Sequence, residues 1–277
     1  MWIKVILCVT GIIPVYTRLC VRIYHWDCMK LDFCMFCEYN SLMKIRSLRR
    51  TLIMDNIELK KSNVQWERMI NEKLYDPLKV GDSSWERIQE AQKKFNESQF
   101  WKDKTAFEEL KKCFAKAPDS MVLTPSVYFD HGDRISFGEN FYANTGLTIL
   151  DENYVTFGDN VFIGPHASIY TAGHPIDAMV RNTGVEYAKP VVIGSNVWIG
   201  GNVIINPGVI VGDNVVIGSG SVVTKSIPSN VIAAGNPCRI IREITQEDEK
   251  NWKRQYEEYL AIIEKNTGER NTNLSNP

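Results

Sequence analysis

The stretch VVIGSNVWIGGNVIINPGVIVGDNVVIGSGSVV, residues 191–223, decides the fold of this chain. An aliphatic residue returns at every sixth position, namely Ile193, Ile199, Ile205, Val211, Ile217 and Val223. A second series of the same period is aliphatic except at Ser221 and runs Val197, Val203, Val209, Val215, Ser221 and Ile227. Such a fixed return indicates a repeat architecture. A β-sandwich of alternating strands would instead show a period of two.

Each hexapeptide is predicted to form one short strand followed by a tight corner. The aliphatic residue points inward, while glycine or asparagine in segments such as GGN and GDN accepts the positive φ of the corner. Three hexapeptides close one triangular turn, and stacked turns bury a continuous column of side chains. The same spacing joins Phe137, Ala143 and Ile149 and, after a two-residue shift, Phe157, Ile163 and Ile169. The sequence therefore predicts a mainly β protein with a parallel β-helix over residues 125–243.

The repeat stops at residues 173–190, GHPIDAMVRNTGVEYAKP. Two prolines and mixed charge prevent this stretch from continuing the coil, so we expect an external loop. Loops that leave a rigid scaffold often carry functional groups. His174 stands at the point of exit, and an imidazole with a pKa near 6.5 is suited to proton transfer. A loop histidine without any chemistry is the alternative interpretation.

Helices are predicted before the β-helix, over residues 66–124. In SSWE, Ser83 and Glu86 have the spacing of a capping box. The apolar residues that follow recur at helical spacing, as Trp85, Ile88, Ala91 and Phe95 in a first helix and Phe107, Leu110 and Phe114 in a second. Pro118 is expected to end the second helix.

A helix and a tail are predicted after the β-helix, over residues 244–277. Thr245 is the expected helix cap. An apolar stripe follows at helical spacing, with Trp252, Tyr256, Tyr259, Leu260 and Ile263. We expect this helix to pack on the assembled protein. The tail after Gly268 is polar and is expected to be disordered.

Residues 1–65 differ from the rest and are expected to lie outside the catalytic unit. The apolar run 5–16 has 12 residues, and as a helix it rises only about 18 Å, against a hydrocarbon core of about 30 Å. No cleavage site of small residues follows it. His25, Cys28, Cys34 and Cys37 are zinc-type ligands, but their spacing is too short for a finger. Met54 is an alternative start, and secretion or membrane anchoring is the alternative to a disordered extension.

The composition is that of a soluble globular protein. The chain has 277 residues, 44% of them hydrophobic and 23% charged, and its net charge is −1. This balance argues against a nucleic-acid or membrane partner. Only Cys113 and Cys238 lie beyond residue 37, whereas a secreted disulfide scaffold would spread its cysteines. We expect two reduced, buried thiols and a cytoplasmic protein.

Several motifs together resemble the maltose/galactoside O-acetyltransferase family of hexapeptide acyltransferases. They are INEKLYDPL (70–78), NFYANTGLTILDE (140–152), TAGHPID (171–177) and GNPCRII (235–241), in addition to the long repeat. The likeness runs from about residue 66 to 245. It implies a left-handed parallel β-helix and a homotrimer with active sites between subunits. It also implies acetyl-CoA as co-substrate, no metal, and a sugar such as maltose, glucose or a galactoside as acceptor.

The resemblance also implies roles for individual residues. His174 matches the family's catalytic base, and the backbone amide of Gly201, where many relatives have serine, matches the donor to the oxyanion and a cofactor contact. The further CoA-binding positions are Ser219, Thr224, Lys225, Arg239 and Arg242. The acceptor-binding positions are Asp76, Asp130, Asn144 and Glu152. Galactoside-type relatives have serine where this chain has Asp130 and aspartate where it has Glu152.

These residue types suit a direct attack of a sugar hydroxyl on the thioester in a ternary complex. A base must take the hydroxyl proton, and a fixed N–H must meet the developing oxyanion. Lysine and arginine suit phosphates, and carboxylates or amides suit hydroxyl groups. Trp198 fits either a place beside the cofactor or the packing of the coil. Cys113 and Cys238 are not expected to carry the acyl group.

Two other functions remain as alternatives. The first is a zinc enzyme of the carbonic-anhydrase type, with His131, His166 and His174 as ligands, although the loop exit separates His166 from His174. The second is a β-helix scaffold without activity. The joint presence of His174, Lys225, Arg239 and Arg242 argues against a scaffold.

Overall fold

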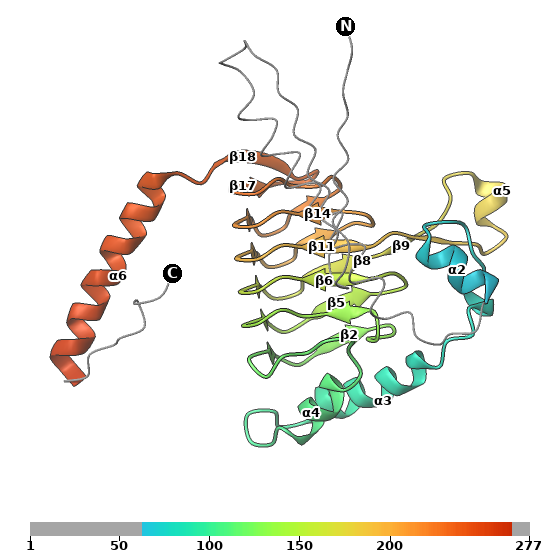
Figure 1. Cartoon of the computed structure of the whole chain (residues 1–277), viewed down its shortest axis with the longest axis horizontal. Helices are drawn as coiled ribbons and strands as arrows, with labels where there is room; N and C mark the ends of the chain where they lie inside the picture. Colours follow the sequence, from blue (N-terminus) through green and yellow to red (C-terminus); the bar gives the residue numbers. More distant parts are fainter. Residues whose placement is uncertain (1–62, 268–277) are drawn as a thin grey trace, which may run out of the picture. The chain divides into compact units, whose positions relative to one another are not determined.

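A parallel β-helix forms the centre of the protein (Figure 1). The structure is a computed structural model and describes residues 63–267. Three parallel sheets make up the faces of the coil, in the orders β14-β11-β6-β3, β1-β4-β7-β12-β15-β17 and β16-β13-β8-β5-β2. In the upper coils Ile193 pairs with Val211, and Ile199 pairs with Ile217. These partners are three hexapeptides apart, so the six-residue period closes one triangular turn, as predicted.

The helices are α2 (Val64–Ile70), the 3-10 helix η1 (Pro77–Lys79), α3 (Ser84–Glu97), α4 (Thr105–Lys111), α5 (Ala178–Arg181) and α6 (Gln246–Thr267). The strands before the loop are β1 (Val122–Leu123), β2 (Val127–Phe129), β3 (Ile135–Ser136), β4 (Tyr142–Ala143), β5 (Leu147–Leu150), β6 (Val155–Phe157), β7 (Phe162–Ile163) and β8 (Ser168–Tyr170). The loop contains β9 (Ala172–Gly173) and β10 (Tyr187–Ala188). The later strands are β11 (Val191–Ile193), β12 (Trp198–Ile199), β13 (Ile204–Ile205), β14 (Ile210–Val211), β15 (Val216–Ile217), β16 (Val222–Val223), β17 (Val231–Ala234) and β18 (Arg239–Glu243).

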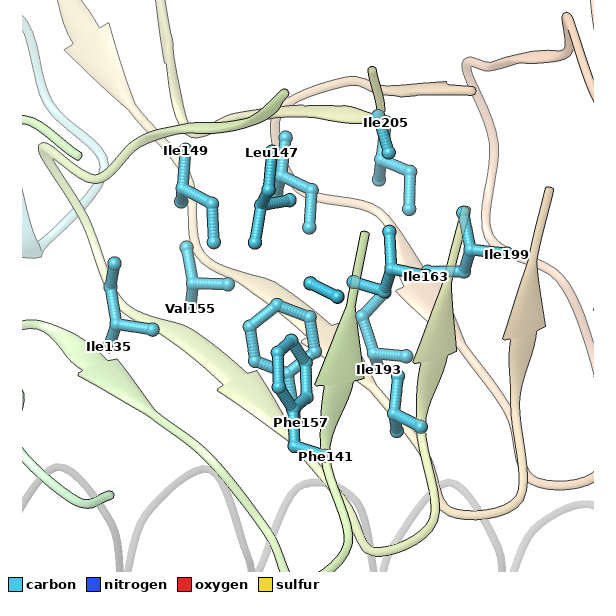
Figure 2. Packing of buried hydrophobic residues seen from close by; sticks show 14 of the residues in the cluster. Ile135, Phe141, Leu147, Ile149, Val155, Phe157, Ile163, Ile193, Ile199 and Ile205 are labelled. Atoms are coloured by element: carbon cyan, nitrogen blue, oxygen red, sulfur yellow. The ribbon is translucent and has the colours of Figure 1, made fainter. Parts of the chain in front are cut away.

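Inward-facing side chains fill the coil (Figure 2). Every member of both six-residue series is buried, including Ser221. Ser221 satisfies its hydroxyl by donating to the Gly218 carbonyl oxygen and accepting from the Gly235 N–H. The rings of Phe137 and Phe157 stack with centroids 5.2 Å apart. This column is the hydrophobic core that the repeat predicts.

Asparagine side chains join the coils at one corner. Asn140, Asn160 and Asn196 have φ values of 55°, 56° and 58°, a left-handed conformation that asparagine tolerates better than most residues. The Asn140 amide donates to Asn160 over 2.9 Å, and the Asn160 amide donates to Asn196 over 3.0 Å. The corner residues therefore supply both the turn geometry and hydrogen bonds between successive turns.

Insertions occur at one corner of the coil. Phe129 pairs with Ile149, and Ile149 pairs with Ile169, so the spacing here is 20 residues. Two extra residues lie after β2 and two more after β5. The second pair is the predicted shift between Ile149 and Phe157, and the first was not predicted. Ile169 pairs in turn with Ile205, because the whole loop 173–190 is inserted after β8. The loop leaves the coil, as predicted, and carries β9, α5 and β10.

Helix α3 covers the edge strand β2. The Asn96 side chain donates to the Val127 carbonyl oxygen and accepts from the Val127 N–H, both over 2.8 Å. The Gln92 side chain accepts from the Phe129 N–H over 2.8 Å. These amides satisfy backbone groups that an open sheet edge would leave unpaired.

Several predicted boundaries are wrong. The coil begins with β1, before residue 125, and α2 begins at Val64, before residue 66. The second helix ends at Lys111, well before Pro118. Ser83 makes no capping hydrogen bond, and the neighbouring Asp82 carboxylate accepts from the Ser84 N–H over 2.9 Å. Trp85 is half exposed, whereas the other residues of its predicted face are buried.

The C-terminal helix α6 begins as predicted. The Thr245 hydroxyl accepts from the Asp248 N–H over 3.3 Å, and the Asp248 carboxylate accepts from the Thr245 N–H over 2.9 Å. Among residues 63–267 no helix is long and apolar enough to cross a membrane. The expectations for the apolar run 5–16, for the cysteines and histidine near the N-terminus, for Met54 and for the tail after Gly268 lie outside the described residues.

We predict that Ile205→Ala lowers the free energy of unfolding by about 2–5 kcal/mol, because it leaves a cavity in the central column. Ile205 is fully buried, while its neighbour Ile204 on the same strand faces outward and is partly exposed. Ile204→Ala is therefore the matched control and should cost clearly less. Urea unfolding of both variants tests this, and equal losses would contradict the inward orientation of the six-residue series.

Candidate active site

The candidate acceptor residues and His174 lie along one corner of the coil, which we call edge A. Edge A is the corner that follows β2, β5, β8, β13 and β16. Asp130 follows β2, Glu152 follows β5, and His174 begins the loop after β8. Successive parallel strands are about 4.8 Å apart. The three inserted segments therefore stack, and this brings together residues that are 22 positions apart along the chain.

Asp130 and Glu152 form a carboxyl pair on edge A. Burial of Glu152, followed by the influence of the neighbouring Asp130 carboxyl group, raises the pKa of Glu152 to about 8. The Thr171 hydroxyl lies 3.4 Å from Glu152 Oε2. Burial, followed by the charge of Asp130, raises the pKa of Tyr128 to about 12. This pair is thus a polar site that contains a donor and several acceptors.

Asp151 holds the backbone that carries this pair. Its buried carboxylate accepts from the N–H groups of Asp130, His131 and Gly132 over 3.0, 3.0 and 2.7 Å. Burial raises the pKa of Asp151, while the hydrogen bonds of the amides act in the opposite direction. The corner after β2 is thereby fixed to the corner after β5.

The buried Arg134 forms an ion pair with Asp82 near this corner. The guanidinium donates to the Asp151 carbonyl oxygen over 3.1 Å, and it stacks on Trp66 at 4.7 Å from the ring centroid. Burial lowers the pKa of Arg134 to about 10. Because Asp82 and Trp66 belong to the helical region, this cation fixes that region to the β-helix.

His174 faces a glutamate across a β-ladder. Gly173 pairs with Tyr187 in the antiparallel β9–β10 ladder, so Glu186 stands opposite His174. His174 Nε2 lies 3.7 Å from Glu186 Oε1, and Nδ1 lies 3.3 Å from the Val185 carbonyl oxygen. The imidazole is half exposed. A Cβ atom on Gly173 would lie 2.6 Å from the Tyr187 hydroxyl, so only glycine fits beside the histidine.

Glu186 is itself held by Tyr75. The Tyr75 hydroxyl donates to Glu186 Oε2 over 2.9 Å, and the two residues exchange backbone hydrogen bonds of 2.9 and 3.0 Å. Burial, followed by the charge of Glu186, raises the pKa of Tyr75 far above its ordinary value. The sequence analysis missed both residues. What places Glu186 opposite His174 is the antiparallel pairing of β9 with β10. This register cannot be read from the sequence of the loop alone.

Asp76 lies next to Tyr75 but its carboxylate has partners within the chain. It accepts from the Leu78 N–H over 3.1 Å and forms an ion pair with Lys79 at 2.7 Å. Hydrogen bonding to Lys79 lowers the pKa of Asp76. Its observed contacts are thus those of a cap for η1.

Asn144, Gly201 and Ser219 lie at a different corner, which we call edge B and which follows β4, β7, β12, β15 and β17. The Gly220 N–H donates to the Gly201 carbonyl oxygen over 2.9 Å, so Gly201 and Ser219 occupy adjacent coils. Within residues 63–267 the Gly201 N–H has no hydrogen-bond acceptor. A Cβ atom on Gly164 would lie 2.6 Å from this nitrogen, so any larger residue at position 164 would crowd the amide.

The candidate CoA-binding residues lie on the last coils. Thr224 and Lys225 follow β16 on edge A and are exposed, while Arg239 and Arg242 belong to β18. Arg239 donates to the Cys238 carbonyl oxygen over 2.9 Å. Arg242 binds Asp248 through two hydrogen bonds of 2.6 and 2.8 Å.

Trp198, Cys113 and Cys238 also lie within the described residues. Trp198 faces outward with 58% of its surface exposed, so it does not pack inside the coil. Cys113 and Cys238 are free and buried, as predicted. Burial raises the pKa of both thiols, which disfavours the nucleophilic thiolate.

The arrangement does not favour a zinc site. His131 Nδ1 lies 3.1 Å from the Ser84 hydroxyl and 3.4 Å from an Asp82 carboxylate oxygen. His166 occupies a corner on edge B, away from the loop exit on edge A. In the part of the chain that the structure describes, no group of three or more histidine, cysteine, aspartate or glutamate residues could hold a metal ion.

Known proteins are similar to this chain in both sequence and fold. Residues 190–225 match the model of the bacterial transferase hexapeptide (six repeats). The galactoside O-acetyltransferase of Escherichia coli is 47% identical over 147 residues, covering 53% of this chain and 72% of that protein. The chain belongs to the family of hexapeptide-repeat galactoside and maltose O-acetyltransferases.

Solved structures of this family have the same architecture. A galactoside acetyltransferase in complex with coenzyme A superimposes with a TM-score of 0.65 and 43% identity, covering 68% of this chain and 94% of that one. A maltose O-acetyltransferase from Clostridium difficile 630 gives a TM-score of 0.62 at 43% identity, covering 65% of this chain and 97% of that one. The family and fold expected from the motifs are therefore confirmed.

We predict that Arg134→Met lowers the free energy of unfolding by about 3–5 kcal/mol, because the buried Asp82 carboxylate loses its guanidinium partner. The double variant Asp82→Asn/Arg134→Met should recover part of this loss. Arg254→Met removes an exposed ion pair on α6 and should cost about 1 kcal/mol or less. Chemical unfolding of the three variants measures the difference, and similar losses for Arg134→Met and Arg254→Met would refute the anchoring role.

Proposed function

We propose that this protein transfers the acetyl group of acetyl-CoA to a hydroxyl group of a sugar or a related small molecule. The observation that carries this proposal is the pairing of His174 with Glu186 on the same edge as the Asp130–Glu152 pair. A base, its orienting carboxylate and a hydroxyl-binding site thus share one edge. Membership of the O-acetyltransferase family supports acetyl-CoA as the donor.

His174 acts as the general base in this proposal. The Val185 carbonyl oxygen can only accept a hydrogen bond, so it favours the tautomer with the proton on Nδ1. Nε2 then has the free lone pair that takes the proton of the acceptor hydroxyl. The Glu186 carboxylate, 3.7 Å from Nε2, stabilises the imidazolium that results.

The acetyl transfer follows from these positions. The acceptor oxygen forms a bond to the thioester carbonyl carbon. The carbonyl oxygen becomes an oxyanion, which accepts a hydrogen bond from the Gly201 N–H. The carbon–sulfur bond then breaks. The imidazolium returns its proton to the CoA sulfur, which leaves as the thiol, and His174 is neutral again.

A complete site requires two copies of the chain. His174 lies on edge A and Gly201 lies on edge B. These two edges bound the same face of the coil, the sheet β16-β13-β8-β5-β2, at its two ends. Edge A of one copy facing edge B of the next brings base and oxyanion donor together. Three copies in a closed ring pair each edge A with the edge B of the next copy. This arrangement leaves no edge unpaired and supports a homotrimer.

The basic residues of the last coils are proposed to bind the phosphates of CoA. Lys225 and Arg239 lie at exposed positions, and Arg242 lies on the same strand as Arg239, where it binds Asp248. Thr224 supplies a hydroxyl group, and Trp198 an exposed aromatic face. We place the reaction in the cytoplasm, in keeping with two free thiols.

Replacing the base provides the direct test. We expect His174→Ala to lower kcat by roughly 10²–10⁴ and to leave acetyl-CoA binding nearly unchanged, because the histidine is not among the residues proposed to bind the CoA phosphates. The assay follows CoA release from acetyl-CoA with glucose, maltose and methyl β-galactoside as acceptors. The matched control is His166→Asn, since asparagine accepts the left-handed corner that His166 occupies, and its kcat should be unchanged.

The outcomes separate the alternatives. Sugar-dependent release that disappears in His174→Ala supports the transferase and the base. An unchanged kcat in this variant refutes the assignment of His174. If acetyl-CoA does not bind at all, the non-catalytic scaffold is the better interpretation.

Glu186 is a positioning residue in this scheme. We expect Glu186→Gln to lower kcat by about tenfold, because the amide orients the ring but does not stabilise the imidazolium electrostatically. The acceptor KM should change little. Tyr75→Phe removes only the hydrogen bond to Glu186 and should have a smaller effect. Steady-state kinetics over pH 5.5–9 check this, and a rise in KM without loss of kcat would indicate a purely structural role.

A further inference from the structure

One buried side-chain amide, that of Asn153, connects the coil to both segments that carry the Tyr75–Glu186 contact. Asn153 follows β5 and is only 1% exposed. Its Nδ2 donates to the Met69 carbonyl oxygen over 3.2 Å and to the Ala188 carbonyl oxygen over 3.1 Å. An amide nitrogen carries two hydrogens, so each of the two segments receives one of them.

The two carbonyl groups lie on either side of the contact that holds Glu186. Met69 is in the last turn of α2, before Tyr75 in the chain, and Ala188 follows Glu186 on β10. Tyr75 and Glu186 form an isolated antiparallel bridge, which has no neighbouring pairs of its own to fix its register. Met69, Tyr75, Val80 and Ala188 form a small hydrophobic core of their own. The amide therefore adds a fixed polar link to both arms of the bridge.

Asn153 is itself held firmly by the coil. Its Oδ1 accepts from the Tyr154 N–H over 2.7 Å, and its own N–H donates to the Thr171 hydroxyl over 3.0 Å. That hydroxyl donates in turn to the Leu150 carbonyl oxygen over 2.8 Å. The Lys189 N–H donates to the Thr171 carbonyl oxygen over 2.7 Å. The coil thereby fixes the orientation of the amide and the place where the loop rejoins it.

The returning part of the loop supplies two groups that contact the imidazole of His174. The Val185 carbonyl oxygen lies 3.3 Å from Nδ1, and Glu186 Oε1 lies 3.7 Å from Nε2. The ring is half exposed, so its orientation depends strongly on these two groups. A misplacement of about 1 Å at a reacting group can cost about 100-fold in rate. The position of the returning strand is therefore a property on which catalysis depends.

We propose that Asn153 is a positioning residue for the His174–Glu186 pair. Its amide holds the returning strand in the register in which Val185 and Glu186 face the imidazole. The amide bonds the strand and not the imidazole, so its effect on the reaction passes through the strand. The inference rests on the proposed function, in which His174 is the base.

The main variant is Asn153→Ala, which removes both donors. We expect kcat to fall by about 10–100-fold, while the KM for acetyl-CoA stays constant because Asn153 is not among the residues proposed to bind CoA. The matched control is Asn96→Ala, which removes an amide that bonds the Val127 backbone twice, away from the loop. It should also lower the melting temperature, but its kcat should be that of the native protein. Both are assayed at 25 °C by CoA release.

A second variant, Asn153→Ser, serves if the alanine variant does not fold. Serine retains one hydroxyl donor in place of two amide hydrogens, and its kcat should fall by about fivefold. In the Glu186→Gln background either substitution should cost less than it does in the native protein, because part of its effect passes through Glu186.

Nitrogen NMR of the histidine rings tests the positioning without any turnover. The full-length protein without ligands is labelled with ¹⁵N-histidine and measured at pH 9, where an ordinary imidazole is neutral. His174→Ala identifies the signals of His174. In the native protein these should report the tautomer with the proton on Nδ1, which the Val185 carbonyl oxygen favours. Asn153→Ala and Asn153→Ser should show a mixture of tautomers, and Asn96→Ala should show the native signals.

The outcomes are distinct. Native kcat and native ring signals in a folded Asn153 variant overturn the proposal. Equal losses of kcat in Asn153→Ala and Asn96→Ala also overturn it, because any lost amide link would then have the same effect. A change of tautomer in Asn153→Ala, when the native protein transfers no acetyl group to any sugar, supports the positioning role and instead overturns the proposed function.

Discussion

Closure of the coil after three hexapeptides is the constraint on which the rest of the structure depends. An inward aliphatic side chain every six residues can stay buried only if successive turns are in register. Asparagine at the left-handed corners reinforces that register, as in the amide ladder of Asn140, Asn160 and Asn196. Once the register is fixed, extra residues cannot enter a face without exposing the column. They must leave at a corner.

The candidate site is built from such departures. Two extra residues after β2 and after β5 carry Asp130 and Glu152, and an 18-residue insertion after β8 carries His174 (Figure 1). All three leave at the same edge, so the repeat stacks them as it stacks its own strands. The antiparallel return of the loop adds Glu186 opposite His174. Rigid coils thus position groups that a mobile loop alone would not hold.

Electrostatics divides this edge into two parts. Beneath the surface, Arg134 and Asp82 neutralise each other and tie the helical region to the first coils. Nearer the surface, this edge carries the carboxyl groups of Asp130, Glu152 and Glu186, and Glu186 lies 3.7 Å from the His174 imidazole. Such a site suits hydroxyl groups, which donate hydrogen bonds to carboxylates and carry no charge. The basic residues proposed for the cofactor lie apart, on the last coils, where they do not compete for these carboxylates.

The sequence by itself determined the β-helix, its family and the loop that leaves it. The six-residue period from Ile193 to Val223 allows few other folds, because burial of one face is a local property of each hexapeptide. His174 could be found because it breaks that period. Its partners Glu186 and Tyr75 could not, since their contact depends on a strand register across the loop. Nor could the raised pKa of Glu152, because a pKa depends on burial and neighbours rather than on residue type. Only the tertiary structure decided that His174 and Gly201 lie on different edges, because the chain must pass along a whole face of the triangle to reach from one corner to the next.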